Sequence, residues 1–170
     1  MNRIFADDGD AATGEGSIRP CEMKDLDELL AVERLCYPRP WSERQFLDEL
    51  QAPHAYLDLL QLNDRLAGYI CYWLAAGELH ILNVATAPAF RRRKVAQRLV
   101  AHAMDQARQR RAERACLEVR RANHGAIALY RSLGFENDCI RRGYYSDGED
   151  ALLMSCPLQI VVEKEPGDQE

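Results

Sequence analysis

Apolar side chains recur every three or four positions between residues 95 and 107, and this spacing predicts an amphipathic helix. The apolar stripe consists of Val95, Leu99, Val100, Ala103, Met104 and Ala107. A similar spacing predicts a helix over residues 26–35. Ser42, with Gln45 three residues later, forms a capping box for a short second helix. Asn123 is suited to cap a helix that runs to residue 133, where Gly134 ends it.

Runs of aliphatic and aromatic residues bounded by turn residues predict seven strands. These strands cover residues 17–21, 55–62, 66–74, 78–86, 114–120, 135–141 and 151–158. Asn63, Asp64 and Arg65 are typical of a turn that joins the second and third strands as a hairpin. In the fourth strand, alternation places one set of side chains on a single face: Leu79, Ile81 and Asn83.

The predicted elements follow the order β-α-α-β-β-β-α-β-α-β-β. A largely antiparallel first half leads to a β-α-β unit, so we expect an α/β or α+β fold. Its mixed, mostly antiparallel sheet would carry helices on both faces. Residues 17–158 contain no repeat or linker and are expected to form one domain. The acidic ends, residues 1–16 and 159–170, are expected to be a disordered leader and a disordered tail.

The composition is that of a soluble globular protein in the cytoplasm. No apolar run approaches the roughly 20 residues that cross a bilayer, and residues 1–10 lack the apolar core of a secretory signal. The six cysteines contain no C-x-x-C pair, and most have apolar neighbours, which is typical of reduced core thiols. Neither the cysteines nor His80, His102 and His124 show the spacing of metal ligands, so we expect no metal site.

The charges of the chain are unevenly distributed. Residues 21–86 carry 11 acidic and 5 basic side chains, whereas residues 91–142 carry 5 acidic and 14 basic ones. The helix that begins near residue 95 follows a turn containing four cations, at positions 91–94. Unpaired backbone N–H groups, the positive end of the helix dipole and these cations together favour an anion site, most naturally for phosphate. A solvated charge run at a helix start is the alternative.

Four segments resemble a known family. The run RRRKVA (91–96) is similar to the acyl-CoA signature of the GNAT superfamily of N-acetyltransferases, with Lys94 in the place of the usual glycine. The runs LEVRRANHGAIALYRSLGF (117–135) and IRRGYYSDGEDALLM (140–154) resemble the bacterial ribosomal-protein alanine N-acetyltransferases, the RimI type. The segment PRPWSERQF (38–46) resembles that group's substrate side. The resemblance covers about residues 17–158 and implies the GNAT-type sheet.

The resemblance also implies roles for individual residues. Glu118 matches the family's general base and Tyr130 its general acid. Contacts to acetyl-CoA, the implied acetyl donor, fall on Val84, Ala85, Thr86, Arg91, Arg92, Arg93, Lys94, Val95, Ala96, Gln97 and Asn123. The implied acceptor groove includes Trp41, Tyr144 and Tyr145.

From the residues alone, structural roles compete with these assignments. Glu118 at a strand end is also suited to an ion pair with Arg120 or Arg121. Tyr130 on an apolar helix face is by default a core tyrosine, and Asn123 is a helix cap whether or not it also touches CoA. Tyr144 and the neighbouring Tyr145 either line a peptide groove or close the core.

The implied reaction moves acetyl from acetyl-CoA to the N-terminal alanine of a small-subunit ribosomal protein. The implied partner is a basic N-terminal peptide, with no nucleic acid and no membrane, and we expect a monomer. An acetyltransferase for lysine side chains, polyamines or small amines has the same fold. A non-catalytic module that binds CoA or nucleic acid is a third reading, which the scarcity of aromatic residues beside the cationic turn disfavours.

Overall fold

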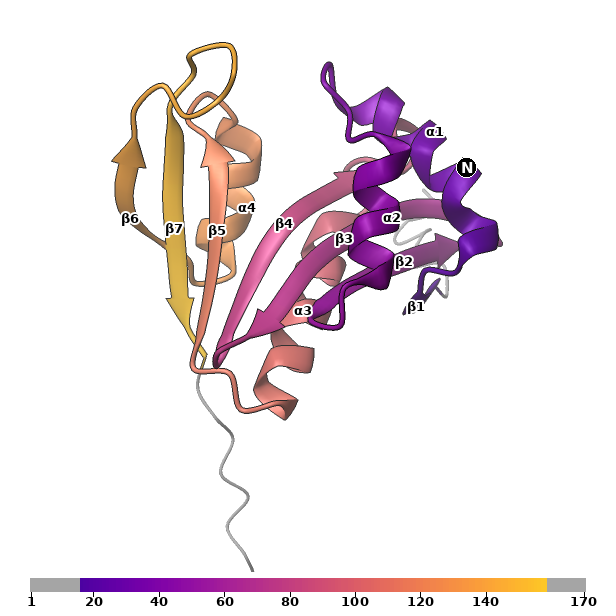
Figure 1. The fold of residues 1–170 in the computed structure, drawn as a ribbon, viewed down its shortest axis with the longest axis horizontal. Helices are drawn as coiled ribbons and strands as arrows, with labels where there is room; N and C mark the ends of the chain where they lie inside the picture. Colours follow the sequence, from indigo (N-terminus) through magenta and orange to yellow (C-terminus); the bar gives the residue numbers. More distant parts are fainter. Residues whose placement is uncertain (1–15, 159–170) are drawn as a thin grey trace, which may run out of the picture.

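The structure is a computed structural model that describes residues 16–158 (Figure 1). The expected leader and tail lie outside the described residues, apart from Gly16, which begins the first strand. The strands are β1 (Gly16–Pro20), β2 (Ala55–Leu62), β3 (Arg65–Ala75), β4 (Glu78–Thr86), β5 (Arg114–Arg120), β6 (Glu136–Arg141) and β7 (Ala151–Pro157). The helices are α1 (Leu26–Cys36), α2 (Glu43–Gln51), α3 (Val95–Gln109) and α4 (His124–Ser132), with single 3-10 turns at Met23–Asp25 and Pro88–Phe90.

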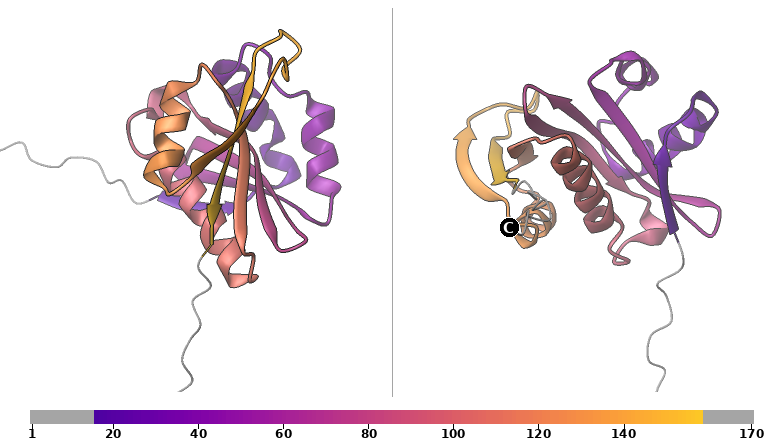
Figure 2. Two further views of the ribbon diagram at one scale, coloured as in Figure 1. Left: turned by 90° about the vertical axis from the view of Figure 1, so that its left-hand side faces the viewer. Right: turned by 90° about the horizontal axis from the view of Figure 1, so that it is seen from below.

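All seven strands form one sheet in the order β1-β2-β3-β4-β5-β7-β6. β4 and β5 run parallel, and every other neighbouring pair is antiparallel. α1 and α2 cover one face, while α3 and α4 cover the other (Figure 2). The predicted element order and the mixed, mostly antiparallel sheet with helices on both faces are confirmed.

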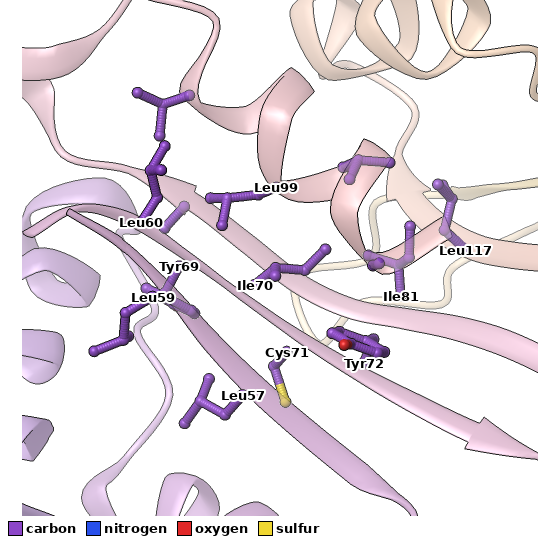
Figure 3. Packing of buried hydrophobic residues seen from close by; sticks show 14 of the residues in the cluster. Leu57, Leu59, Leu60, Tyr69, Ile70, Cys71, Tyr72, Ile81, Leu99 and Leu117 are labelled. Carbon is purple, nitrogen blue, oxygen red and sulfur yellow. The ribbon is translucent and has the colours of Figure 1, made fainter. Parts of the chain in front are cut away.

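The two faces of the sheet are built by alternate residues of β3. On one face, the Tyr69 hydroxyl bonds to Glu33 of α1. On the other, Gly68 lies so close to α3 that a Cβ there would be 2.7 Å from Cγ1 of Val95 and 2.4 Å from the carbonyl oxygen of Ala85. Figure 3 shows Leu60 and Ile70 on the side of Leu99, with Leu57, Leu59 and Cys71 on the opposite side. The absence of a side chain at Gly68 therefore lets α3 approach the centre of the sheet.

The local signals for helices are confirmed. All six residues of the predicted α3 stripe are buried. Ser42 and Gln45 form the capping box of α2, and the Asn123 side chain accepts the Ala126 N–H at the start of α4. Gly134 follows α4 with φ +92°, the left-handed conformation typical of a helix C-terminus.

The structure differs from the prediction at the hairpin turn and in the faces of β4. The hairpin turn contains only Asn63 and Asp64, with φ 51° and 57°, and Arg65 already belongs to β3. This is the two-residue turn whose positive φ values match the twist of the strands. Ile81 pairs with Tyr72 and Asn83 with Cys71, so Leu82 forms a bulge. Because Tyr72 and Cys71 point to opposite faces, the prediction that Ile81 and Asn83 share a face is wrong.

The six cysteines are free thiols, but they do not all lie in the core. Cys21, Cys71 and Cys156 are buried, Cys36 and Cys116 are half-buried, and Cys139 is exposed on β6. Among residues 16–158, no three His, Cys, Asp or Glu side chains gather as a metal site would require. None of the helices in this part of the chain is long and apolar enough to cross a membrane.

Candidate active site

A cavity lies where β4 and β5 separate. The two strands pair from Glu78 with Arg114 to Ile81 with Leu117, and beyond these residues they diverge (Figure 1). The space between them is a cavity of about 670 Å³, lined by residues 81–84 of β4 and 117–120 of β5. The end of α1, the loop after it, α4 and the β6–β7 loop complete the wall. The bulge at Leu82 lies at the point where the two strands diverge. Because a bulge bends its strand, it accounts for the divergence.

Glu118 lines the cavity from β5. Its Oε1 accepts a hydrogen bond from Nη1 of Arg141 on β6, at 2.5 Å. The alternative of an ion pair with Arg120 or Arg121 is wrong, because Arg120 pairs with Asp147 and Glu149, and Arg121 with Asp150. The pairing follows from strand order: β7 separates β5 from β6, and the long Arg141 side chain reaches across it.

Tyr130 lines the same cavity from α4. Its side chain is buried, with its ring packed against Phe135 at a centroid distance of 5.8 Å. Burial raises the pKa of Tyr130 to about 12, so the phenol keeps its proton throughout the physiological range. Tyr130 is thus both a core tyrosine and a cavity residue.

The predicted acceptor residues are separated by the structure. Trp41 and Tyr145 line the cavity. Tyr144 is 48% exposed and does not belong to the part of the cavity lining that residues 16–158 form. The two tyrosine rings meet edge to face at 5.3 Å, and the Arg120 guanidinium lies 4.0 Å above the Tyr145 ring. Tyr145 therefore lines the cavity, whereas Tyr144 lies outside it, where the nearby Glu118 carboxylate raises the pKa of Tyr144.

Val84, Ala85 and Thr86 form the end of β4 beside the region of divergence. Val84 lines the cavity, and its carbonyl oxygen accepts the Tyr37 hydroxyl at 2.5 Å. The carbonyl oxygen of Thr86 accepts the Cys36 thiol at 3.2 Å, and Ala85 is buried in the core. Hydrogen bonds from Cys36 and Tyr37 thus hold the end of α1 against the C-terminal end of β4.

The cationic turn lies outside this cavity, whose wall over residues 16–158 does not include positions 91–94. Arg92 and Lys94 adopt φ values of 62° and 58°, and Lys94 is the N-cap residue of α3. Residues of alternating sign of φ point successive backbone N–H groups into a concave anion site. Within the described chain, the Nε atom of Arg93 is buried with no hydrogen-bond partner. The turn therefore holds an unsatisfied donor at the start of a helix, beside exposed Arg91 and Arg92.

The remaining predicted donor contacts lie on the first turn of α3 and at the start of α4. Val95 is buried against the sheet, while Ala96 and Gln97 are half-buried. Asn123 lines the cavity between β4 and β5, while its Oδ1 accepts the Ala126 N–H at 3.1 Å. Its role as a cap is therefore compatible with a place in the site.

Residues 26–135 match the model of the acetyltransferase (GNAT) family. The chain belongs to this family. It is 33% identical over 147 residues to the ribosomal protein bS18-alanine N-acetyltransferase of Escherichia coli K12, covering 85% of this chain and 99% of that one. The crystal structure of the E. coli ribosomal-protein-S18-alanine N-acetyltransferase superposes with a TM-score of 0.80 at 32% identity, covering 90% of this chain and 100% of that one. An N-alpha-acetyltransferase of Sulfurisphaera tokodaii is 30% identical over 157 residues, or 85% of this chain and 94% of that one.

Several cavity residues of this GNAT chain were not predicted from the sequence. Glu33, Tyr37 and Asn83 line the cavity and hydrogen-bond with neighbouring elements. Glu33 did leave a signal, because it lies on the apolar face of α1 four residues after Leu29. Arg141, which is bonded to the cavity residue Glu118, left no signal, because the two residues are 23 positions apart in the sequence.

Polar contacts of Arg39 connect the α1–α2 loop with the β6–β7 loop, and both loops line the cavity. Asp147 and Glu149 of the β6–β7 loop bind Arg120 at 2.9 Å and 2.6 Å. Arg39 of the α1–α2 loop donates to the Ser146 hydroxyl at 2.5 Å and lies 3.7 Å from Asp147. The charged groups of the wall are Glu33, Glu118, Asp147 and Glu149 against Arg39 and Arg120, a balance that favours a cationic ligand.

Proposed function

We propose that this protein is an acetyl-CoA-dependent N-terminal acetyltransferase. It acetylates the α-amine of the N-terminal alanine of a small-subunit ribosomal protein, in the cytoplasm. The observation that carries the proposal is that Glu118 and Tyr130 line one cavity where β4 and β5 diverge. The similarity to the bS18-alanine N-acetyltransferase of E. coli over nearly all of that protein supports the choice of acceptor. We assign residues 17–158 as the catalytic domain and expect a monomer, which light scattering after size exclusion tests.

The turn at positions 91–94 fits the diphosphate of acetyl-CoA. The positive φ values of Arg92 and Lys94 aim backbone N–H groups outward, and the unpartnered Nε of Arg93 supplies a further donor. We assign the donor contacts to this turn, to the first turn of α3 at Val95, Ala96 and Gln97, to the edge of β4 at Val84–Thr86, and to Asn123. Acetyl-CoA supplies a thioester, which an amine attacks without metal activation.

Glu118 and Tyr130 carry the proton transfers in this proposal. A free α-amine has a pKa of about 7.7–8.0, against about 10.4 for lysine. The free energy of deprotonation is therefore about 3 kcal/mol lower for the α-amine than for a lysine side chain. Glu118 accepts the proton that the amine loses as its nitrogen bonds to the acetyl carbon, directly or through a water. Tyr130, kept protonated by burial, donates its hydroxyl proton to the sulfur as the carbon–sulfur bond breaks.

The acceptor enters between the α1–α2 loop and the β6–β7 loop in this proposal. Trp41 and Tyr145 present aromatic surfaces to it, with Tyr144 at the outer edge. The excess of carboxylates in the wall suits an N-terminal ammonium followed by basic residues. The recognised partner is therefore a basic N-terminal peptide rather than a nucleic acid.

Intact-mass analysis of peptides incubated with acetyl-CoA tests the function. A peptide that begins with a free alanine followed by basic residues is expected to gain one acetyl group. The same peptide with a blocked N-terminus and internal lysines should react far more slowly. Equal rates on the two peptides would identify a lysine or general amine acetyltransferase. No transfer, with retention on heparin but not on CoA-agarose, would identify a nucleic-acid-binding module.

A further inference from the structure

Glu33 is a buried carboxylate that the proton transfers above do not use. It lies near the end of α1, is 1% exposed and lines the cavity. Its Oε1 accepts the backbone N–H of Trp41 at 2.7 Å and the side-chain amide of Asn83 at 3.4 Å. Its Oε2 accepts the Tyr69 hydroxyl. One carboxylate therefore joins α1 to the α1–α2 loop, to β3 and to the bulge of β4.

These partners are neutral groups. Over residues 16–158, the hydrogen bonds of Glu33 come from a backbone N–H, an amide and a phenol, none of which is a cation. Burying a carboxylate without a cation costs more free energy than burying an apolar side chain of similar volume. Net stability of the fold is therefore a poor explanation for this residue, and the explanation lies in what the carboxylate holds in place.

The group held by Glu33 is Trp41. The Trp41 and Phe46 rings pack against each other with their centroids 5.3 Å apart, and the centroids of the Phe46 and Tyr69 rings are 5.6 Å apart. The Tyr69 hydroxyl returns to Glu33, and Glu33 binds the backbone of Trp41. This closed ring of four residues fixes Trp41 through both its backbone and its indole. Trp41 in turn forms part of the cavity wall.

We propose that Glu33 is a positioning residue for the acceptor, which it affects through Trp41. The carboxylate holds the α1–α2 loop against Asn83 of β4, so that the acceptor wall of the cavity keeps a fixed distance from the strand beside the donor. The shorter bond, to Trp41, makes the acceptor side the more sensitive one. This inference rests on the proposed function for its kinetic consequence, but the placement of the loop does not depend on that function.

The first measurement follows the loop without any acceptor. The chain has two tryptophans, so Trp73→Phe leaves Trp41 as the sole indole in the full-length protein. In that background, Glu33→Gln should increase the quenching of Trp41 fluorescence by acrylamide. Glu28→Gln is the matched control, because it removes the same charge from an exposed position of the same helix. Quenching in Glu33→Gln equal to that of the control would overturn the proposal.

The second measurement is steady-state transfer to a peptide that begins with alanine. Glu33→Gln should raise the KM for this peptide about tenfold, or about 1.4 kcal/mol, while the Kd of acetyl-CoA is unchanged. An unchanged peptide KM, or an equal loss of acetyl-CoA affinity, would overturn the proposal. If Glu33→Gln does not fold, Tyr69→Phe is judged by the same two measurements, since it removes the hydroxyl that donates to Glu33 and accepts from Asn83. A wild-type protein that acetylates no peptide would refute the proposed function instead, and the quenching result would then decide the role of Glu33.

Discussion

Lys94 carries backbone strain that glycine would relieve. Its φ of 58° lies in the left-handed region, which costs an L-residue about 1–2 kcal/mol relative to the right-handed helix. Glycine avoids this cost but loses about 0.5–1 kcal/mol more chain entropy on folding. The difference predicts that Lys94→Gly stabilises the fold by about 0.5–1 kcal/mol. For a chain of this length, that shift corresponds to a rise in Tm of about 1–4 °C.

The assay is denaturant and thermal unfolding of wild type, Lys94→Gly and Lys94→Ala. Lys94→Ala is the control, because alanine keeps the Cβ that makes positive φ unfavourable and removes only the charge and the stem. We expect Lys94→Ala to unfold with the wild type and Lys94→Gly at higher denaturant concentration. A glycine variant no more stable than the alanine variant would refute the strain argument.

Donor binding separates the charge of Lys94 from its backbone. An ammonium beside a phosphate contributes roughly 1.5–3 kcal/mol, which exceeds the stability of about 0.5–1 kcal/mol that glycine would add. Calorimetric titration of acetyl-CoA should therefore show a steeper loss of affinity with salt in the wild type than in Lys94→Gly. Lys94→Ala, with the strain but without the charge, should bind most weakly. Wild-type affinity in the alanine variant at low salt would show that the ammonium does not contact the phosphates.

Three further predictions concern catalysis and stability. Glu118→Gln and Tyr130→Phe should each lower kcat by about 10- to 10⁴-fold while acetyl-CoA binding, followed by calorimetry, is retained; near-normal turnover in both would remove their proton-transfer roles. Gly68→Ala should destabilise the fold by about 1–3 kcal/mol in denaturant unfolding, because its Cβ would lie 2.4 Å from a carbonyl oxygen of β4, and wild-type stability would contradict this packing. Hydrogen bonds from the Arg19 guanidinium lower the pKa of Asp25 from 3.8 to about 2. Because the folded-state pKa is the lower one, the Arg19–Asp25 pair adds about 2 kcal/mol to the free energy of unfolding above pH 4. This contribution is lost as the pH falls toward 2. The unfolding free energies of Asp25→Asn and wild type should therefore differ above pH 4 and converge near pH 2.

Local patterns in the sequence determined the elements of this protein. The bounds of β4 and β5, the buried stripe of α3 and the caps Ser42 and Asn123 follow from residues a few positions apart. Such features depend on the period of a helix or strand and on hydrogen bonds within one turn. The resemblance of residues 117–135 to a family motif identified Glu118 and Tyr130 as candidates, and the structure places both on one cavity wall.

Only the tertiary structure decided which groups meet. The bulge at Leu82 reversed the expected face of Asn83 and brought it to Glu33, 50 residues away. The partner of Glu118 is Arg141 rather than a neighbour in sequence, because strand order places β6 beyond β7. The charge balance of the two halves of the chain did not locate the acidic wall, to which both halves contribute. Register, bulges and strand order arise from packing across the whole sheet, so residues adjacent in the chain do not report them.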